Sequence, residues 1–314
     1  MLGCRSLNAR TRCFALSLLL GSATVAATDN CPDLEPEVER LLQAMSSNAQ
    51  QVSYSGVVTL QRGGDMQVIE MSHGVENGEE TEVISRLTGQ DARVERSGHS
   101  TGCMHPGHQL LQASAALGSG VCGLGTSYRF RVAPGGRIAG RAALRLRAEP
   151  LDMYRFGYVF EIDRDTALML KSTTLAPDQR VLEQFQFASI EMQASPVAEA
   201  EIAHQAKHPH PHEPPVQDQG LPWEVVWLPE GFVPTDAAPQ RSLRKSYTDG
   251  LASFSVFLEP LGRAIKPGEG LERQGSTVAY TRGLQLQGRP VLVTVLGEIP
   301  TNTARMVADA VRLR

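Results

Sequence analysis

A long series of short strand patterns, joined by hairpin signals, constrains this fold more than any other feature. From Tyr54 onward, apolar and β-branched residues alternate with polar ones in short segments. Gly63-Gly64, Asn77-Gly78 and Gly89 separate the first of these segments and favour tight turns. Because the connections leave little room for crossover helices, we predict sequential antiparallel strands rather than a parallel sheet. The predicted strands cover residues 54–62, 66–73, 81–87, 92–96, 128–132, 143–148, 154–162, 167–175 and 181–192.

Helical periodicity is confined to a few places in the chain. An apolar stripe at helical spacing predicts one helix over residues 34–49, and a second stripe predicts another over residues 302–313. A small-residue region at 110–117 predicts a short helix. The strand patterns at 223–228, 251–258, 276–281 and 291–296 precede the C-terminal helix, so we predict a small sheet-and-helix unit there.

The N-terminus has the layout of a secretory signal peptide. Three arginines precede an apolar run over residues 14–20, and small residues with Val25-Ala26-Ala27 at a cleavage site follow. The run is shorter than the roughly 20 residues needed to span a bilayer as a helix. We therefore expect the mature chain to work outside the cytoplasm in an oxidising compartment. Its net charge falls from −4 to −7 when the leader is removed, which argues against a nucleic-acid partner.

Composition also marks a boundary in the mature chain. Residues 196–221 are rich in histidine and proline and have almost nothing to bury, as is typical of an extended linker. We therefore predict a signal peptide over 1–27, an N-terminal β domain over 28–195, a linker over 196–221 and a C-terminal domain over 222–314.

Three cysteines remain after processing, Cys31, Cys103 and Cys122. A short loop closes most easily, so we predict a disulfide between Cys103 and Cys122, with other pairings left open. Histidines near Cys103 and in the linker match no standard zinc spacing, and we predict no metal site. The chain has no nucleophile elbow, HExxH or phosphate-binding loop. We therefore predict no catalytic residues and no cofactor.

The more informative signal is apolar. Aromatic and aliphatic side chains recur at strand spacing in three places, and two interpretations are open for them. They form an ordinary sheet core, or they line a curved, incompletely closed sheet that holds acyl chains. The candidate wall residues are Tyr54, Val58, Tyr154, Phe156, Tyr158, Phe160, Phe185 and Phe187. In the C-terminal unit, Phe257 lies on the opposite strand face from Phe254 and Val256, which makes it a candidate for an inter-domain or partner contact. A strand that is buried on both faces is the alternative interpretation.

Several segments resemble the MucB/RseB family of periplasmic sigma-E regulators. They are residues 154–172, 182–187, 227–232 and 293–300, and above all 247–257, which reads Tyr-Thr-Asp-Gly-Leu-Ala-Ser-Phe-Ser-Val-Phe. The resemblance implies an unclosed antiparallel β-barrel similar to periplasmic lipoprotein carriers, followed by a smaller sheet-and-helix domain.

The resemblance also implies a function and partners. A protein of this family would act in the periplasm, bind the periplasmic part of a membrane-spanning anti-sigma factor and shield it from proteolysis. Acyl chains of lipoprotein or lipopolysaccharide would release that shield. Two other classes are weighed against this interpretation, a plain lipid or lipoprotein carrier and an envelope hydrolase. The sequence does not decide whether the protein forms a homo-oligomer.

Overall fold

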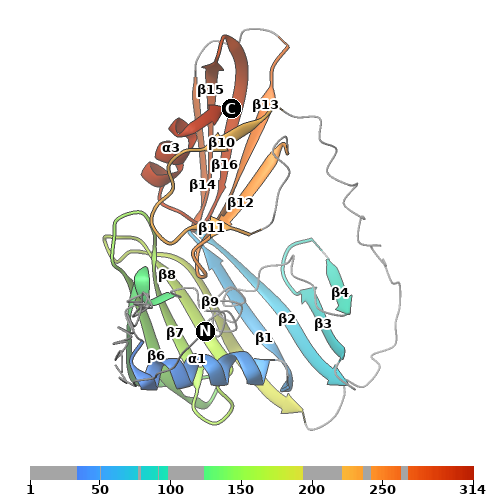
Figure 1. Ribbon diagram of the computed structural model, residues 1–314. Helices are drawn as coiled ribbons and strands as arrows, with labels where there is room; N and C mark the ends of the chain where they lie inside the picture. Colours follow the sequence, from blue (N-terminus) through green and yellow to red (C-terminus); the bar gives the residue numbers. More distant parts are fainter. Residues whose placement is uncertain are drawn as a thin grey trace, which may run out of the picture. The chain divides into compact units, whose positions relative to one another are not determined.

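The computed structural model describes residues 34–49, 51–76, 79–90, 92–97, 124–193, 221–235, 242–262 and 268–314 (Figure 1). The predicted signal peptide, the helix predicted at 110–117, the Cys103–Cys122 pair and nearly all of the predicted linker lie outside these residues. The histidines considered for metal binding near Cys103 and in the linker lie outside them as well.

A nine-stranded antiparallel sheet forms the first part of the fold. Its strands lie in the order β4-β3-β2-β1-β9-β8-β7-β6-β5, so β4 and β5 are its two edges and do not pair with each other. The strands are β1 (Ser53–Arg62), β2 (Asp65–Glu76), β3 (Glu79–Arg86), β4 (Arg93–Ser97), β5 (Tyr128–Ile138), β6 (Arg141–Pro150), β7 (Gly157–Asp163), β8 (Met169–Leu175) and β9 (Val181–Gln193). The prediction of an unclosed antiparallel sheet is therefore confirmed.

All neighbours in this sheet are consecutive in sequence except β1 and β9. β1 pairs with β2 on one side and with β9 on the other, and the register shifts between Val57 and Val58. Gly56 lies at this pairing, where a Cβ would overlap the backbone carbonyl of Ser189. The close approach of β1 to β9 thus requires glycine at this position.

Two local departures from the predicted strands have clear causes. β7 begins at Gly157 and not at Tyr154, because the backbone N–H of Tyr154 donates to the Asp152 carboxylate (2.8 Å) and holds a turn. β5 continues to Ile138, well beyond the predicted end. It then turns into β6 through Ala139 and Gly140, both with positive φ, as a two-residue hairpin turn requires.

The helix α1 (Pro36–Ala49) covers part of one face of this sheet. Its buried side chains are Val38, Leu42 and Met45, at the spacing that the sequence predicts. They pack into one apolar cluster with residues of β5, β6 and β7. We call the sheet face that receives them the inner face.

A six-stranded sheet in the order β11-β12-β13-β16-β15-β14 forms the second part, with a two-stranded pair of β10 and β17. Its elements are β10 (Trp223–Val225), β11 (Val233–Pro234), β12 (Arg244–Thr248), β13 (Ser253–Pro260), β14 (Glu269–Gln274), β15 (Thr277–Leu286), β16 (Arg289–Gly297), α3 (Thr301–Asp309) and β17 (Val311–Leu313). α3 lies against β15 and β16 (Figure 1). Its side chains Ala304, Val307 and Ala308 are buried in the core of this part. The predicted sheet-and-helix unit is confirmed.

The structure corrects the C-terminal helix. It ends at Asp309, not at residue 313, because residues 311–313 pair as β17 with β10 while Val311 is buried in the core. The sequence patterns do not predict β11, β12 or β14. All six residues of β14 are exposed, so no apolar alternation marks this strand.

Candidate ligand face and polar junction

The inner face carries two apolar clusters built from the predicted aromatic positions. Phe156, Tyr158 and Phe160 lie in the first, which also contains the buried side chains of α1. Tyr158 stacks on Phe160 with ring centroids 5.9 Å apart. Met169 packs against both clusters and so connects them.

The second cluster centres on β1 and β9. It contains Tyr54, Val58, Phe185 and Phe187, and all four are at most 6% exposed. Tyr54 and Phe187 meet edge to face at 5.8 Å, as do Phe185 and Phe187 at 5.5 Å. Burial is the main reason that the pKa of Tyr54 lies above its ordinary value, because the phenolate is disfavoured in an apolar environment.

Beyond these buried side chains the inner face is partly open. Leu60, Ile69 and Ile84 pack against the second cluster but are only half-buried, and Val94 on the edge strand β4 is 40% exposed. Cross-strand pairing places Ile84 directly opposite Val94 and Met71. Within the described part of the chain, no helix covers this half of the inner face. An apolar, partly open face of this kind can receive an acyl chain.

Two predicted site residues lie elsewhere. Tyr154 precedes β7 and packs edge to face on Trp227 at 5.4 Å, and its backbone carbonyl accepts a hydrogen bond from Thr303 (3.0 Å). It therefore contacts the C-terminal part of the chain and not the inner face. Phe257 is half-buried on the face of β13 that points away from the core, directly opposite Arg244 and Thr294.

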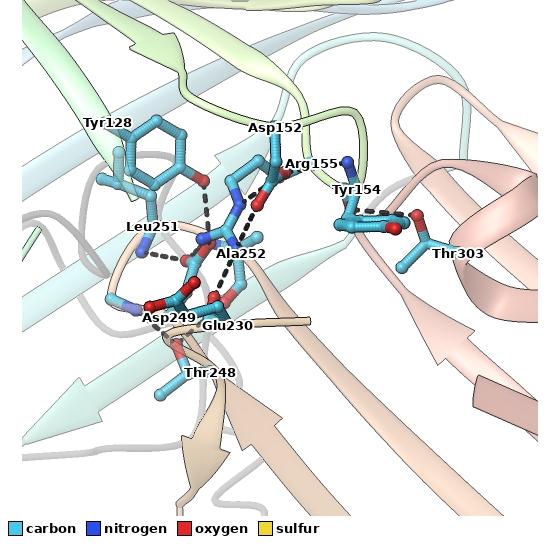
Figure 2. A network of polar contacts seen from close by, with 11 residues as sticks. Tyr128, Asp152, Tyr154, Arg155, Glu230, Thr248, Asp249, Leu251, Ala252 and Thr303 are labelled. Carbon is cyan, nitrogen blue, oxygen red and sulfur yellow. Dashed lines mark hydrogen bonds and ion pairs between the residues drawn. The ribbon is translucent and has the colours of Figure 1, made fainter. Parts of the chain in front are cut away.

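A buried ion pair joins the two sheets, and Figure 2 shows it from close by. Arg155, just before β7, donates to the carboxylate of Asp249, just after β12, at 2.8 Å, and both side chains are fully buried. Tyr128 of β5 also donates its hydroxyl to Asp249 (2.9 Å). Arg155 further donates to Asp152 and to the carbonyl of Glu230. We call this network the polar junction.

The short loop 249–252 carries the C-terminal half of the junction. The second carboxylate oxygen of Asp249 accepts the backbone N–H groups of Leu251 (2.9 Å) and Ala252 (2.7 Å). Thr248 closes the turn by donating to the carbonyl of Ala252. Leu251 is 4% exposed and belongs to the first inner-face cluster, so a side chain from the six-stranded part packs among the aromatic residues of the nine-stranded sheet.

A second polar contact joins the same two sheets. Glu183 of β9 accepts from Arg62 (3.0 Å) and from Ser276, in the turn just before β15 (2.8 Å). Glu298 follows β16 nearby, and burial, then the charge of Glu183, raise its pKa to about 7. Burial likewise raises the pKa of Asp249, although Arg155 acts in the opposite direction. Burial thus makes the carboxyl groups of Glu298 and Asp249 more costly to ionise than they are in water.

The sequence pattern did not single out the junction residues. Arg155 lies between Tyr154 and Phe156, where period-two alternation predicts a solvent-facing polar residue, so its burial cannot be inferred from the pattern. Asp249-Gly250 is an ordinary turn dipeptide by itself.

No group of three or more histidine, cysteine or acidic residues among the described residues could hold a metal ion. No helix in the described ranges is long and apolar enough to cross a membrane.

Comparisons with known proteins agree over nearly the whole chain. The model of the MucB/RseB N-terminal domain matches residues 37–209, and that of the MucB/RseB C-terminal domain matches residues 217–312. The sigma factor AlgU regulatory protein MucB of Pseudomonas aeruginosa is 32% identical over 320 residues, covering 96% of this chain and 98% of that protein. The sigma-E factor regulatory protein RseB of Salmonella typhimurium is 25% identical and covers 96% and 98%. The solved complex of Pseudomonas aeruginosa MucA and MucB superposes with a TM-score of 0.72 at 31% identity, covering 88% of this chain and 99% of that one.

Proposed function

The chain belongs to the MucB/RseB family, and from that membership we propose that it binds the periplasmic part of a membrane-spanning anti-sigma factor and shields it from proteolysis. One observation carries this proposal: the similarity to a protein solved as a complex with MucA extends over both sheets. The proposed place of action is the periplasm, which fits the leader predicted over residues 1–27.

The surface that we propose for the anti-sigma segment is the outer face of the six-stranded sheet. α3 and the core lie on the other face, so Phe257, Leu292 and Leu296 are left half-buried or exposed without cover from a described element. Serine and threonine residues, such as the hydrogen-bonded Ser246 and Ser255, surround them. Surfaces that combine apolar and polar side chains, with an aromatic residue among them, are typical of contacts between proteins and peptides.

The inner face of the nine-stranded sheet is our proposed acyl-chain site. Its support is the partly open apolar half formed by Leu60, Ile69, Ile84 and Val94, which adjoins the buried aromatic clusters. Each methylene buried there contributes roughly 0.8 kcal/mol, so part of a lipoprotein or lipopolysaccharide acyl chain gives useful affinity. We propose that an acyl chain bound at this site weakens the binding of the anti-sigma factor, because the acyl chain binds more tightly to the form of the protein that is free of the anti-sigma factor.

A matched pair of variants tests the partner surface. Leu296→Ala changes an exposed leucine on the outer face. Leu271→Ala removes another exposed leucine, which lies on β14 opposite the core residue Tyr280 and therefore on the other face of the sheet. We expect titration calorimetry with the purified periplasmic segment of the anti-sigma factor to show weaker binding for Phe257→Ala and Leu296→Ala. Leu271→Ala should bind as the unmodified chain does. Equal affinity of all four proteins would refute the assigned surface.

A plain lipid carrier is the second candidate, favoured by the same open inner face. The two functions differ in a direct measurement, the cleavage of the anti-sigma segment by its site-one protease in the presence of this chain. A regulator slows cleavage and loses that effect when palmitate is added. A carrier binds palmitate and leaves cleavage unchanged. The absence of catalytic residues, which speaks against an envelope hydrolase, stays a prediction from sequence.

A further inference from the structure

The loop 249–252 belongs to the C-terminal part of the molecule and contacts the nine-stranded sheet, on which we place the acyl-chain site. Leu251 is buried in the first inner-face cluster, which also contains Tyr128, Phe156 and Tyr158, and Tyr128 donates to Asp249 of the same loop. Phe156 and Tyr158 are candidate wall residues of the acyl-chain site. An apolar ligand that enters this cluster therefore competes with the side chain of Leu251.

The backbone of the loop links Leu251 to the ion pair. The N–H groups of Leu251 and Ala252 both donate to Asp249, and the N–H of Asp249 donates back to Ala252. A displacement of Leu251 that moves its backbone therefore also displaces the Asp249 carboxylate. The partners lost are Arg155 and Tyr128, both on the nine-stranded sheet.

The polar junction is built from groups that add little net stability to the contact between the two sheets, so this contact can separate. Burying an ion pair costs desolvation that its attraction only partly returns, so such a pair favours a defined arrangement more than it adds stability. The hydroxyl of Tyr158, buried in the same region, has no hydrogen-bond partner among the described residues. An entirely apolar contact of the same size would hold the two parts together more firmly.

We propose that Leu251 is a built-in competitor for the acyl-chain site: an acyl chain that enters the first inner-face cluster expels Leu251, breaks the Arg155–Asp249 pair and frees the six-stranded part. This inference rests on the proposed acyl-binding function and specifies how the site is regulated. Occupancy of one part of the chain thereby changes the arrangement of the part that we assign to the partner.

The chain contains its own reporter for this event. It has two tryptophans, of which Trp223 is fully buried in the C-terminal core and Trp227 packs on Tyr154 of the other part. Separation of the two parts removes Tyr154 from Trp227 and leaves Trp223 in place. The emission of Trp227 should therefore shift to the red on opening, and Trp227→Phe should abolish that change.

The test is a palmitate titration of the full chain by calorimetry and tryptophan emission. Leu251→Ala removes the competitor, and we expect palmitate affinity to rise about tenfold, because a larger fraction of molecules has the site open. Tyr128→Phe, which removes one hydroxyl and keeps the ring, should give a smaller rise. Leu271→Ala, the same change at an exposed position away from the junction, should leave the affinity unchanged.

Each outcome decides a different point. Tighter binding to Leu251→Ala with a palmitate-dependent change in Trp227 emission supports the proposal. Equal affinity of Leu251→Ala and the unmodified chain, a rise shared by Leu271→Ala, or unchanged emission at saturation overturns it while acyl binding stands. Failure of palmitate to bind any of these proteins overturns acyl binding and, with it, this inference.

Discussion

Removing one member of the Arg155–Asp249 pair should cost far more than removing one member of a surface ion pair. Both side chains are fully buried, and Arg155→Met leaves the Asp249 carboxylate with Tyr128 and two backbone N–H groups but no cation. Asp249→Asn keeps the acceptor for those N–H groups and turns an amide toward the guanidinium. Leaving one charge of a buried pair without its partner typically costs about 3–5 kcal/mol, and we expect Arg155→Met to lose that amount. Asp249→Asn should lose less, because Arg155 keeps its ion pair with Asp152.

The double variant Arg155→Met/Asp249→Asn removes both charges and should be destabilised by much less than the two single losses together. We expect a coupling free energy of about 2 kcal/mol or more from urea unfolding followed by tryptophan emission and circular dichroism. Arg314 and Glu224, 2.6 Å apart and both well exposed, are the control pair, for which the same cycle should give less than about 1 kcal/mol. Additivity within about 0.5 kcal/mol at the buried pair would refute the reasoning.

Three further predictions concern other parts of the chain. Burial, followed by the charge of Glu183, raises the pKa of Glu298 from 4.5 to about 7, so the folded state retains a proton that the unfolded state loses. The free energy of unfolding should therefore fall as the pH rises through this window. Glu298→Gln should flatten that part of the pH profile measured by urea unfolding. Gly297→Ala should lower stability by about 3 kcal/mol, since its Cβ would overlap the Phe254 backbone, whereas Gly262→Ala, with open space around it, should change the melting temperature little. Phe185→Asp should unfold the nine-stranded part, while Val94→Asp should keep its circular dichroism spectrum and lose palmitate binding; a folded Phe185→Asp protein would place Phe185 on an open wall instead.

The sequence predicts most of the nine-stranded sheet because its strands have one buried and one solvated face. Period-two alternation and Gly-rich turns are local signals, and local signals locate hairpins. β14 gives no such signal, because all its residues are exposed and its pairing with β15 is a tertiary effect. The predicted C-terminal helix includes the three residues of β17, because so short a segment carries too little periodicity to distinguish a strand from the end of a helix.

The candidate site is harder to predict because its residues are far apart in sequence. The alternation correctly indicates that Phe156, Tyr158 and Phe160 share a face, but the Asp152 turn takes Tyr154 away from it. Arg155 and Asp249 are 94 residues apart, and each alone resembles a surface charge. The fold alone brings together the segments 154–172 and 247–257, which contain Arg155 and Asp249.

The single non-consecutive pairing in the nine-stranded sheet has a kinetic consequence. Hairpins such as β1–β2 or β7–β8 need only a short turn to close, whereas 121 residues separate Arg62 from its partner Glu183 across the β1–β9 pair. Closing the longer loop costs more chain entropy, so β1–β9 pairing should come late and limit the folding rate. Until it forms, β1 and β9 each present an unpaired, apolar edge. A chain that ends before Val181 would keep the edge of β1 exposed permanently, and such edges pair with other chains and aggregate.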